Sequence, residues 1–499
     1  MRRTAAITCG GRKSACGALL LWVLLCRPAG ALVSTNVPLD HWSYAAVEKL
    51  ADYGLIDSSM LTVKPLSRVE MARHVAAALY TREGTPDAPA ILESILERLT
   101  DEFREELVLL GVLDGSYDDS SIKPVEDLYV AYLYARNEPD LENVRGDEFR
   151  RGSNVRAGFA SRAKLFDTAA FYVRPEYAYS SPRDDVDLIE VYGKVMVGPF
   201  EVEAGKDSLW WGPGHHGSLL LSNNAPPLRM VKLSNPEPLP LPWFLRALGP
   251  FKGQWFLAEL EEDRDFPHVK LTGLRLNLKP HPLVELGASR VVMLGGEGAP
   301  SVPWYKYATS LLTIGAEEAE SNQLAGLDGS LLLPLPDRVP LRTIKLYGDF
   351  YGEDEASGAP SKWSYLVGAS FNDILRTGRT DLRVEYVDTY PVAYTHSLYT
   401  SGYTYEGRVL GHHVGPDARD LFVQLSHYLR SDLVVDLAYD RQTHTPRGNA
   451  ERIENFLESG LTVFPSRDWW IRAGYRFENR DDWGNDNNHI AYVELARRF

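Results

Sequence analysis

Residues 421–440 read LFVQLSHYLRSDLVVDLAYD, and this stretch decides the fold class. Apolar residues occupy almost every second position on both sides of Arg430-Ser431-Asp432, and polar residues are concentrated at the positions between them. A period of two is the repeat of a β-strand that has one apolar and one polar face. The sequence therefore predicts two long antiparallel strands joined by a short turn.

The same alternation recurs along residues 123–499, often in runs longer than an ordinary strand of about five or six residues. Short connections such as Pro465-Ser466-Arg467 alternate with long ones such as Gly295–Ser321, and Arg, Lys, Asp and Glu recur on the polar face. A soluble β-sandwich also alternates. Together, however, these features favour an all-β transmembrane barrel, antiparallel, with about 16–18 strands and 18 preferred.

The composition excludes other classes of protein. The chain has 499 residues, of which 44% are hydrophobic, so it is not intrinsically disordered. The longest apolar run, Ala18–Cys26, is nine residues, whereas a spanning helix needs about 20. The formal charge of −15 argues against a nucleic-acid partner, which requires a basic surface.

The N-terminus has the features of an export signal. Arg2, Arg3 and Lys13 precede the apolar run, and the small residues of Ala29-Gly30-Ala31 follow it. Residues 1–31 are therefore predicted to be a signal peptide cleaved after Ala31. Cleavage would remove all three cysteines and five basic residues, and would lower the formal charge to −20.

The last alternating run ends at Phe499, and this end resembles the C-terminal signal of bacterial outer-membrane barrels. The resemblance implies a location in the cell outer membrane. It also implies contact with outer-membrane lipid and with the machinery that inserts barrels.

The region before the barrel is expected to be helical and periplasmic. Residues 35–82 read as short helices. Residues 87–112 read as one linker helix, because its apolar residues recur at helical spacing.

Residues 37–50 (VPLDHWSYAAVEKL) and 65–72 (PLSRVEMA) resemble the opening and the close of an S-layer homology (SLH) domain. The motif residues are Asp40, Trp42, Arg68 and Glu70. The resemblance implies binding to a peptidoglycan-linked polymer. Only one copy is present, however, whereas polymer-binding versions often act in threes, so a helical cap on the barrel end is an equal alternative.

Residues 205–227 read GKDSLWWGPGHHGSLLLSNNAPP and resemble the signature of the Wzi family of capsule assembly proteins. The resemblance implies an 18-stranded outer-membrane barrel that acts as a lectin and has helices on its periplasmic side. It would bind exported capsular or extracellular polysaccharide and help to assemble or retain it at the cell surface. The main alternative is an SLH-tethered porin or substrate-specific channel, and a surface glycan-processing enzyme is a third.

Sugar recognition uses flat aromatic faces together with amide and charged groups. The candidate polysaccharide-binding residues in this region are Trp210, Trp211, His215, Asn223, Asn224 and Arg229. Gly212, Pro213 and Gly214 are expected to form a rigid turn. The alternative is a purely structural role, with the two tryptophans wedging a loop inside the barrel.

No catalytic residue, cofactor or metal is expected. The pairs His215-His216 and His412-His413 suggest metal ligands, but adjacent residues of a strand point to opposite faces. The acidic run at residues 261–265 offers carboxylates of the kind that glycosidases use, and a solvated loop is the preferred interpretation.

Overall fold

The structure is a computed structural model that describes residues 32–84, 89–181, 183–312, 321–356, 359–445, 451–480 and 487–499. The predicted signal peptide and residues 87–88 of the predicted linker helix lie outside these ranges.

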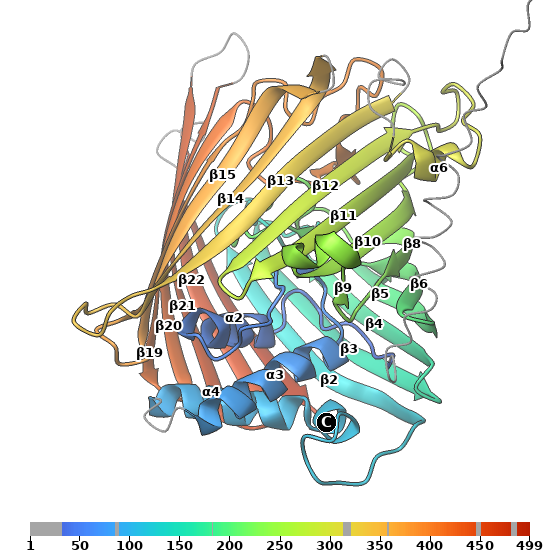
Figure 1. Cartoon of the computed structure of the whole chain (residues 1–499). Coiled ribbons are helices and arrows are strands. Elements are labelled where there is room, and N and C mark those ends of the chain that lie inside the picture. The colour runs from blue at the N-terminus through green and yellow to red at the C-terminus, as the bar shows by residue number, and fades with distance from the viewer. Residues whose placement is uncertain are drawn as a thin grey trace, which may run out of the picture.

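A closed antiparallel barrel forms the body of the described chain, and it confirms the preferred count of eighteen strands (Figure 1). The strands are β2 (Ser121–Ala135), β3 (Gly152–Leu165), β4 (Ala169–Ser180), β5 (Arg183–Val197), β6 (Phe200–Asp207), β8 (Leu228–Ser234), β10 (Pro250–Glu259), β11 (Lys270–His281), β12 (Val284–Leu294), β13 (Ser321–Pro334), β14 (Thr343–Ala356), β15 (Ala359–Ile374), β16 (Thr380–Asp388), β19 (Ala418–Arg430), β20 (Leu433–His444), β21 (Arg452–Ser466), β22 (Trp469–Arg480) and β23 (Asn488–Arg498). The first and last strands close the ring, from Asp127 opposite Arg498 to Ala135 opposite Ile490. The short β9 (Leu239–Pro240) continues the line of β8 along β10.

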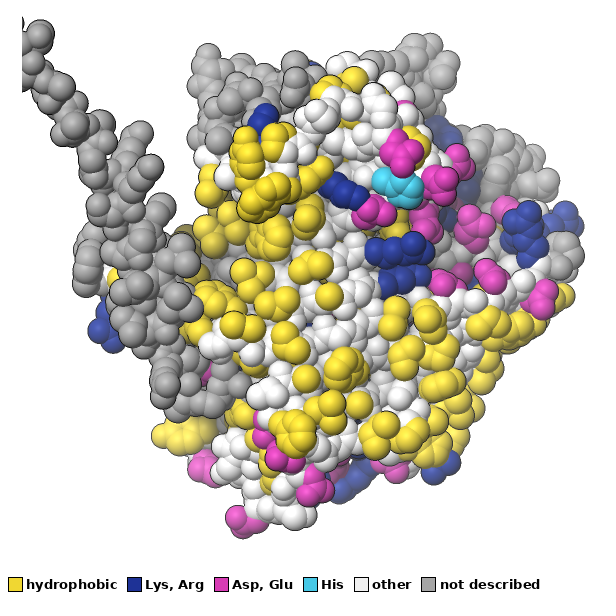
Figure 2. All heavy atoms as spheres, turned by 90° about the vertical axis from the view of Figure 1, so that its right-hand side faces the viewer, with side chains coloured by type: hydrophobic (Ala, Val, Ile, Leu, Met, Phe, Trp, Pro, Cys, Tyr) yellow, Lys and Arg dark blue, Asp and Glu magenta, His cyan; other side chains and the backbone are white. Residues whose placement is uncertain are grey.

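The alternating sequence places apolar side chains on the outer face of the barrel wall and polar side chains on the inner face. On β19 and β20 the side chains of Leu421, Leu425 and Leu437 are exposed on the outside, whereas Asp420 and Asp440 are buried inside. Figure 2 shows hydrophobic side chains spread over the middle of one face of the barrel, with charged side chains gathered above and below them. Such an apolar belt would be unfavourable in water, and it fits a surface that contacts lipid.

The connections differ between the two ends of the barrel. Two-residue turns such as 431–432 and 467–468 lie at one end, and the long loops 295–320 and 389–417 lie at the other. In outer-membrane barrels the short turns are periplasmic and the long loops are extracellular. The helices of residues 43–109 lie at the end with the short turns (Figure 1). None of the described helices is long and apolar enough to cross a membrane.

The helical domain, residues 32–113, comprises α2 (Ser43–Tyr53), β1 (Val63–Lys64), α3 (Arg68–Glu83), α4 (Ala90–Glu102) and α5 (Arg104–Leu109). Its helices share one apolar core, in which Val47 and Leu50 of α2 belong to the same cluster as Leu96 and Leu99 of α4.

The helix expected over residues 87–112 is two helices, because the chain leaves helical geometry at Phe103, where φ is −106° and ψ is 26°. The Phe103 ring is fully buried in the apolar core, with the Arg68 guanidinium 5.0 Å from its centroid. The segment therefore folds back onto the other helices instead of forming a linker.

Candidate functional site

The signature motif lies inside the barrel. After β6 the chain leaves the wall, and it rejoins the wall only at β8, so residues 208–227 form what we call the plug segment. Its short strand β7 (Trp210–Trp211) pairs with β1 of the helical domain, where Val63 lies opposite Trp211. The Trp211 amide also donates a 3.0 Å hydrogen bond to the carbonyl of Leu221. The plug segment is thus a hairpin attached to the helical domain.

Trp211 is a packing residue rather than a sugar platform. It is 1% exposed, and its indole N–H donates to the side chain of Gln254 on β10. Its ring meets Phe256 edge-on, with the centroids 5.4 Å apart. No face of the indole is open to a ligand, which supports the structural interpretation of this residue.

The turn at Gly212 is fixed by the wall. Gly212 has φ of 132°, and a Cβ there would lie 2.8 Å from the hydroxyl oxygen of Ser218. The amides of His215 and His216 donate to the carboxylate of Glu385 on β16, at 2.6 and 2.8 Å. These charge-assisted bonds anchor the turn to the barrel.

A second wall carboxylate acts in the same way on the next residues of the plug segment. The amide of Leu219 donates to the carboxylate of Asp349 on β14 at 3.0 Å. Sequence reasoning missed both Glu385 and Asp349, because they lie more than a hundred residues beyond the motif.

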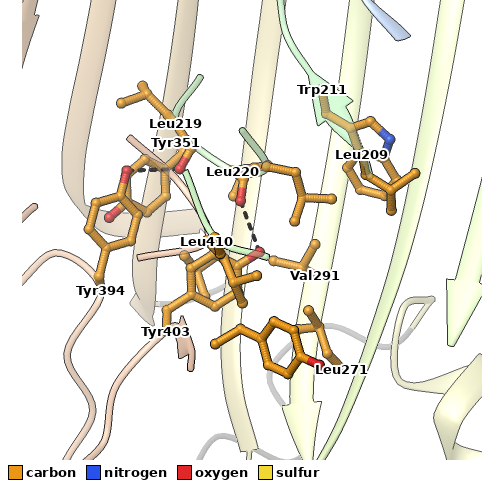
Figure 3. Packing of buried hydrophobic residues seen from close by; sticks show 14 of the residues in the cluster. Leu209, Trp211, Leu219, Leu220, Leu271, Val291, Tyr351, Tyr394, Tyr403 and Leu410 are labelled. Carbon is orange, nitrogen blue, oxygen red and sulfur yellow. Dashed lines mark hydrogen bonds between the residues drawn. The ribbon is translucent and has the colours of Figure 1, made fainter. Parts of the chain in front are cut away.

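The loop between β16 and β19, residues 389–417, packs on the extracellular side of the plug segment. This loop carries the two-residue strands β17 (Thr404–Tyr405) and β18 (Arg408–Val409). Figure 3 shows the hydroxyls of Tyr394 and Tyr403 donating to the carbonyls of Leu219 and Leu220, at 2.8 and 2.9 Å. The three leucines 219–221 are buried between the loop and the wall. The mouth of the barrel is therefore packed like a protein core.

The polar candidates Asn223 and Asn224 lie inside the barrel, whereas Arg229 lies on its outer face. The side-chain amide of Asn223 donates to the carbonyl of Asn143, and that of Asn224 donates to the carbonyl of Val409. Both amides therefore hold loops in place. Arg229 lies on β8 in phase with Val231 and is exposed on the outer face, so it does not join the lumen group.

Trp210 and His215 line a cavity of about 370 Å³ between α2, the plug segment and the wall. The indole nitrogen of Trp210 is buried and has no hydrogen-bond partner among the described residues. An adjoining cavity of about 250 Å³ shares His215. Asn223 lines the larger cavity as well, and of these three candidates only His215 is exposed.

The charges around this cavity are paired with one another. Lys345 lies 3.0 Å from Glu48 and 3.3 Å from Asp52, and Arg383 lies 3.3 Å from Glu48. Burial would raise the pKa of Glu48, but Arg383 and Lys345 outweigh it and hold the pKa well below its usual value. Burial and the neighbouring Glu48 raise the pKa of Asp52 to about 6. The cavity is therefore lined by both charged and apolar side chains.

The SLH-like motif residues hold the helical domain against the wall. The Arg68 guanidinium lies 3.0 Å from Glu102, 2.8 Å from Glu106 and 3.3 Å from Glu126 of β2. Glu70 forms a capping box with Ser67. It also forms an ion pair with Lys252 of β10.

The other two motif residues also contact the barrel. Asp40 lies 3.0 Å from Arg174 of β4 and pairs with Arg145. The ring of Trp42 lies 5.4 Å from that of Phe464 on β21. All four side chains are therefore engaged in docking.

Acid is expected to loosen this docking. Burial alone would raise the pKa of Glu106, but Arg68 and Arg162 outweigh it and lower the pKa to about 2. Its stabilising effect is present above the unfolded pKa of about 4.5 and is lost as the pH falls through the folded value. Burial lowers the pKa of His41 to about 4. The docked state therefore also loses stability as the pH falls from about 6.5 to 4.

The measurement is protease resistance of residues 32–113 in the full-length protein at pH 7, 5 and 3. We expect protease resistance to be highest at pH 7, lower at pH 5 and lowest at pH 3. Heat-modifiable gel migration should show that the barrel stays intact. Equal resistance at all three values would contradict this assignment of the ion cluster.

One further cluster forms at the plug. His216 of the plug segment, His413 of the loop, Asp420 and Asp440 bring their side-chain ligand atoms within 4.8 Å of one another. No local sequence pattern connects these residues, because they come from the plug segment, the loop and two strands of the wall.

The fold and this interior define a class: an outer-membrane β-barrel whose lumen is filled by its own chain. The model of the capsule assembly protein Wzi family matches residues 134–489, and the chain belongs to that family. The resemblance of the signature motif is thereby confirmed.

Three individual proteins are similar to the chain. An uncharacterized 55.8 kDa protein in the cps region of Klebsiella pneumoniae is 33% identical over 181 residues, which is 36% of this chain and 35% of the relative. The match thus spans about a third of the relative's length. Escherichia coli Wzi, described as a carbohydrate-binding β-barrel involved in group 1 capsule assembly, has a TM-score of 0.73 at 20% identity, covering 94% of this chain and 100% of that chain. Acinetobacter baumannii OccAB2 has a TM-score of 0.49 at 11% identity, covering 77% and 99%.

Proposed function

We propose that this chain binds capsular or extracellular polysaccharide at the outer-membrane surface and helps to assemble or retain it there. Membership of the capsule assembly family supports the proposal, as does the carbohydrate binding described for Escherichia coli Wzi. The structural observation that carries it is the packed mouth, in which Tyr394 and Tyr403 hold the leucines of the plug segment. A filled lumen favours a binding surface over a porin.

The extracellular loops would supply that surface. Trp304 and Tyr305 lie in the loop after β12, just before the short helix α6 (Lys306–Thr309), and are 84% and 51% exposed. Their rings meet edge-on, with the centroids 6.2 Å apart. Exposed aromatic faces of this kind stack on the C–H groups of sugars. Sequence reasoning chose the motif tryptophans instead, although an adjacent Trp-Tyr pair in a long loop was a usable signal.

Replacing Trp304 and Tyr305 together by Ala is expected to weaken polysaccharide binding about tenfold, because two stacking faces are lost. The probe is polysaccharide purified from the surface of the host bacterium, and binding to the full-length protein in detergent is measured by biolayer interferometry. Tyr80→Ala is the matched control, since Tyr80 is 81% exposed but lies on α3 at the opposite end. Equal losses in the double variant and the control would remove this pair from the binding surface.

The function itself is tested in cells. A strain that lacks the gene should release surface polysaccharide into the medium, and the full-length chain should restore the cell-bound fraction. Unchanged retention in the deletion strain would overturn the proposal. Solute uptake that depends on the chain, with retention unaffected, would support the channel instead.

For the helical domain, a cap on the periplasmic end is favoured over binding to a peptidoglycan-linked polymer. The support is that Arg68 and Glu70 are both engaged with groups of the barrel wall. Full-length protein in detergent is therefore expected to stay in solution when mixed with isolated sacculi. Sedimentation with the sacculi would favour the polymer-binding role.

A further inference from the structure

A group of nitrogen and oxygen atoms gathers where three parts of the molecule meet. His216 belongs to the plug segment, His413 belongs to the extracellular loop 389–417, and Asp420 and Asp440 lie on the neighbouring strands β19 and β20. The two histidines come from different His-His pairs. The local expectation that adjacent histidines point apart therefore does not bear on this cluster, which forms only when distant segments meet.

The spacing of these atoms is that of a coordination sphere. The Nε2 atom of His413 lies 3.3 Å from Oδ2 of Asp420, and Nε2 of His216 lies 3.4 Å from Oδ2 of Asp440 and 3.9 Å from Oδ2 of Asp420. Around a tetrahedral zinc ion with bonds of about 2.0–2.2 Å, neighbouring ligand atoms lie about 3.3–3.6 Å apart. All four ligand atoms lie within 4.8 Å of one another, so side-chain shifts of up to about an ångström would complete a tetrahedral site.

Most of the ligand atoms have no hydrogen-bond partner among the described residues, and the exception is Oδ2 of Asp440, which accepts a 2.8 Å hydrogen bond from the side chain of Gln442. Asp420 is 1% exposed, and neither of its carboxylate oxygens has a hydrogen-bond partner among the described residues. The same holds for Nε2 of His216 and for both ring nitrogens of His413. Buried polar atoms are nearly always satisfied, so unpartnered donors and acceptors aimed at one point indicate a missing ligand.

The nearby guanidinium does not supply the missing charge. Arg476 lies on β22, and its side chain is paired with Glu142 at 2.6 Å and with Glu478 at 3.1 Å. The two buried carboxylates on adjacent strands have histidines as their ion-pair partners, and neither is paired with a Lys or Arg side chain among the described residues. A divalent ion would neutralise both of them.

The ligands are held in place by their surroundings. The ring of His216 stacks on Phe422, with centroids 3.9 Å apart and an interplanar angle of 7°. Its backbone amide is held by Glu385. Such support fixes the orientation of a ligand before the metal binds.

We propose that His216, His413, Asp420 and Asp440 form a zinc site that joins the plug segment and the extracellular loop to the barrel wall. Two imidazoles and two carboxylates suit Zn²⁺, whereas Ca²⁺ and Mg²⁺ prefer sites made entirely of oxygen. The ion would cross-link the plug segment, the extracellular loop and the barrel wall, and would keep the mouth of the barrel closed.

The test is zinc binding to the full-length protein in detergent after chelator treatment and dialysis. Isothermal titration with ZnCl₂ should give one Zn²⁺ per chain with micromolar or tighter affinity, and zinc should raise the unfolding temperature. Asp420→Asn should weaken binding at least about tenfold, because it removes a charged ligand. His413→Gln should do the same, and it serves as the second variant where Asp420→Asn does not fold.

His427→Gln is the matched control, because His427 also lies on β19 but has its ring nitrogen 2.9 Å from the hydroxyl of Thr380. It should bind zinc like the unmodified chain. Heat-modifiable gel migration shows which variants are folded. The proposal is overturned if the chain binds no zinc in the titration, or if both ligand variants bind zinc as tightly as the control does.

Discussion

Arg68→Met is expected to release the helical domain from the barrel, at a cost of about 3–5 kcal/mol in docking free energy. Arg68 is the shared cation of Glu102, Glu106 and Glu126, and all three carboxylates are buried. Without Arg68, Arg162 alone would pair with Glu106 and Glu126, and Arg498 with Glu102. The buried cluster would then carry excess negative charge, which costs more than losing a surface ion pair. The methionine keeps most of the apolar volume, so the lost charge dominates.

The measurement for this variant is hydrogen exchange of residues 32–113 in the full-length protein. Amides protected by docking should exchange about 10²- to 10³-fold faster in Arg68→Met, since each 1.4 kcal/mol is about a factor of ten. The control is Arg73→Met on the same helix, where Arg73 is partly exposed and lies 3.6 Å from Glu237. That surface pair should cost less than about 1 kcal/mol. Equal protection in the two variants would show that Arg68 does not hold the domain.

Trp211→Ala is expected to loosen the plug, at a cost of about 3–5 kcal/mol for truncating a fully buried aromatic side chain. The variant would leave a cavity beside Phe256, and it would leave the side-chain oxygen of Gln254 without its donor. The barrel wall should survive, because its strands are joined by hydrogen bonds that this residue does not make.

Single-channel recording in planar bilayers reports the state of the plug. The unmodified chain should be closed, and Trp211→Ala should show discrete conductance steps. Trp363→Ala is the control, because Trp363 is exposed on the outer face of β15. Steady conductance of the unmodified chain would favour the channel alternative. A silent Trp211→Ala variant that migrates as a folded barrel would show that other contacts close the lumen.

The barrel was predictable because its signal is local and repeated. Each strand carries its own period of two, and the stretch 421–440 alone already contains two strands and their turn. The position of Arg229 was not predictable in the same way. Strand β8 is seven residues long and has apolar residues on both faces, so the sequence does not reveal which face is the lumen.

The interior of the barrel could not be predicted, because its contacts join residues that are far apart in sequence. The motif Trp-Trp-Gly-Pro-Gly was recognisable, yet its anchor Glu385 is 170 residues from His215. The same is true of the cluster of His216 with Asp440, which no local pattern connects. The residue types Gly212, Pro213 and Gly214 indicate a turn. The residues that contact this turn are determined by the closed barrel, and the local sequence does not reveal them.

The central claim, that this chain holds polysaccharide at the membrane surface, is tested most directly by flotation. Full-length protein is placed in liposomes and mixed with fluorescently labelled polysaccharide purified from the host bacterium, and the mixture is centrifuged through a density gradient. The label should float with the proteoliposomes, and not with empty liposomes or with liposomes that contain an unrelated barrel. Label that stays at the bottom of all three gradients would contradict it.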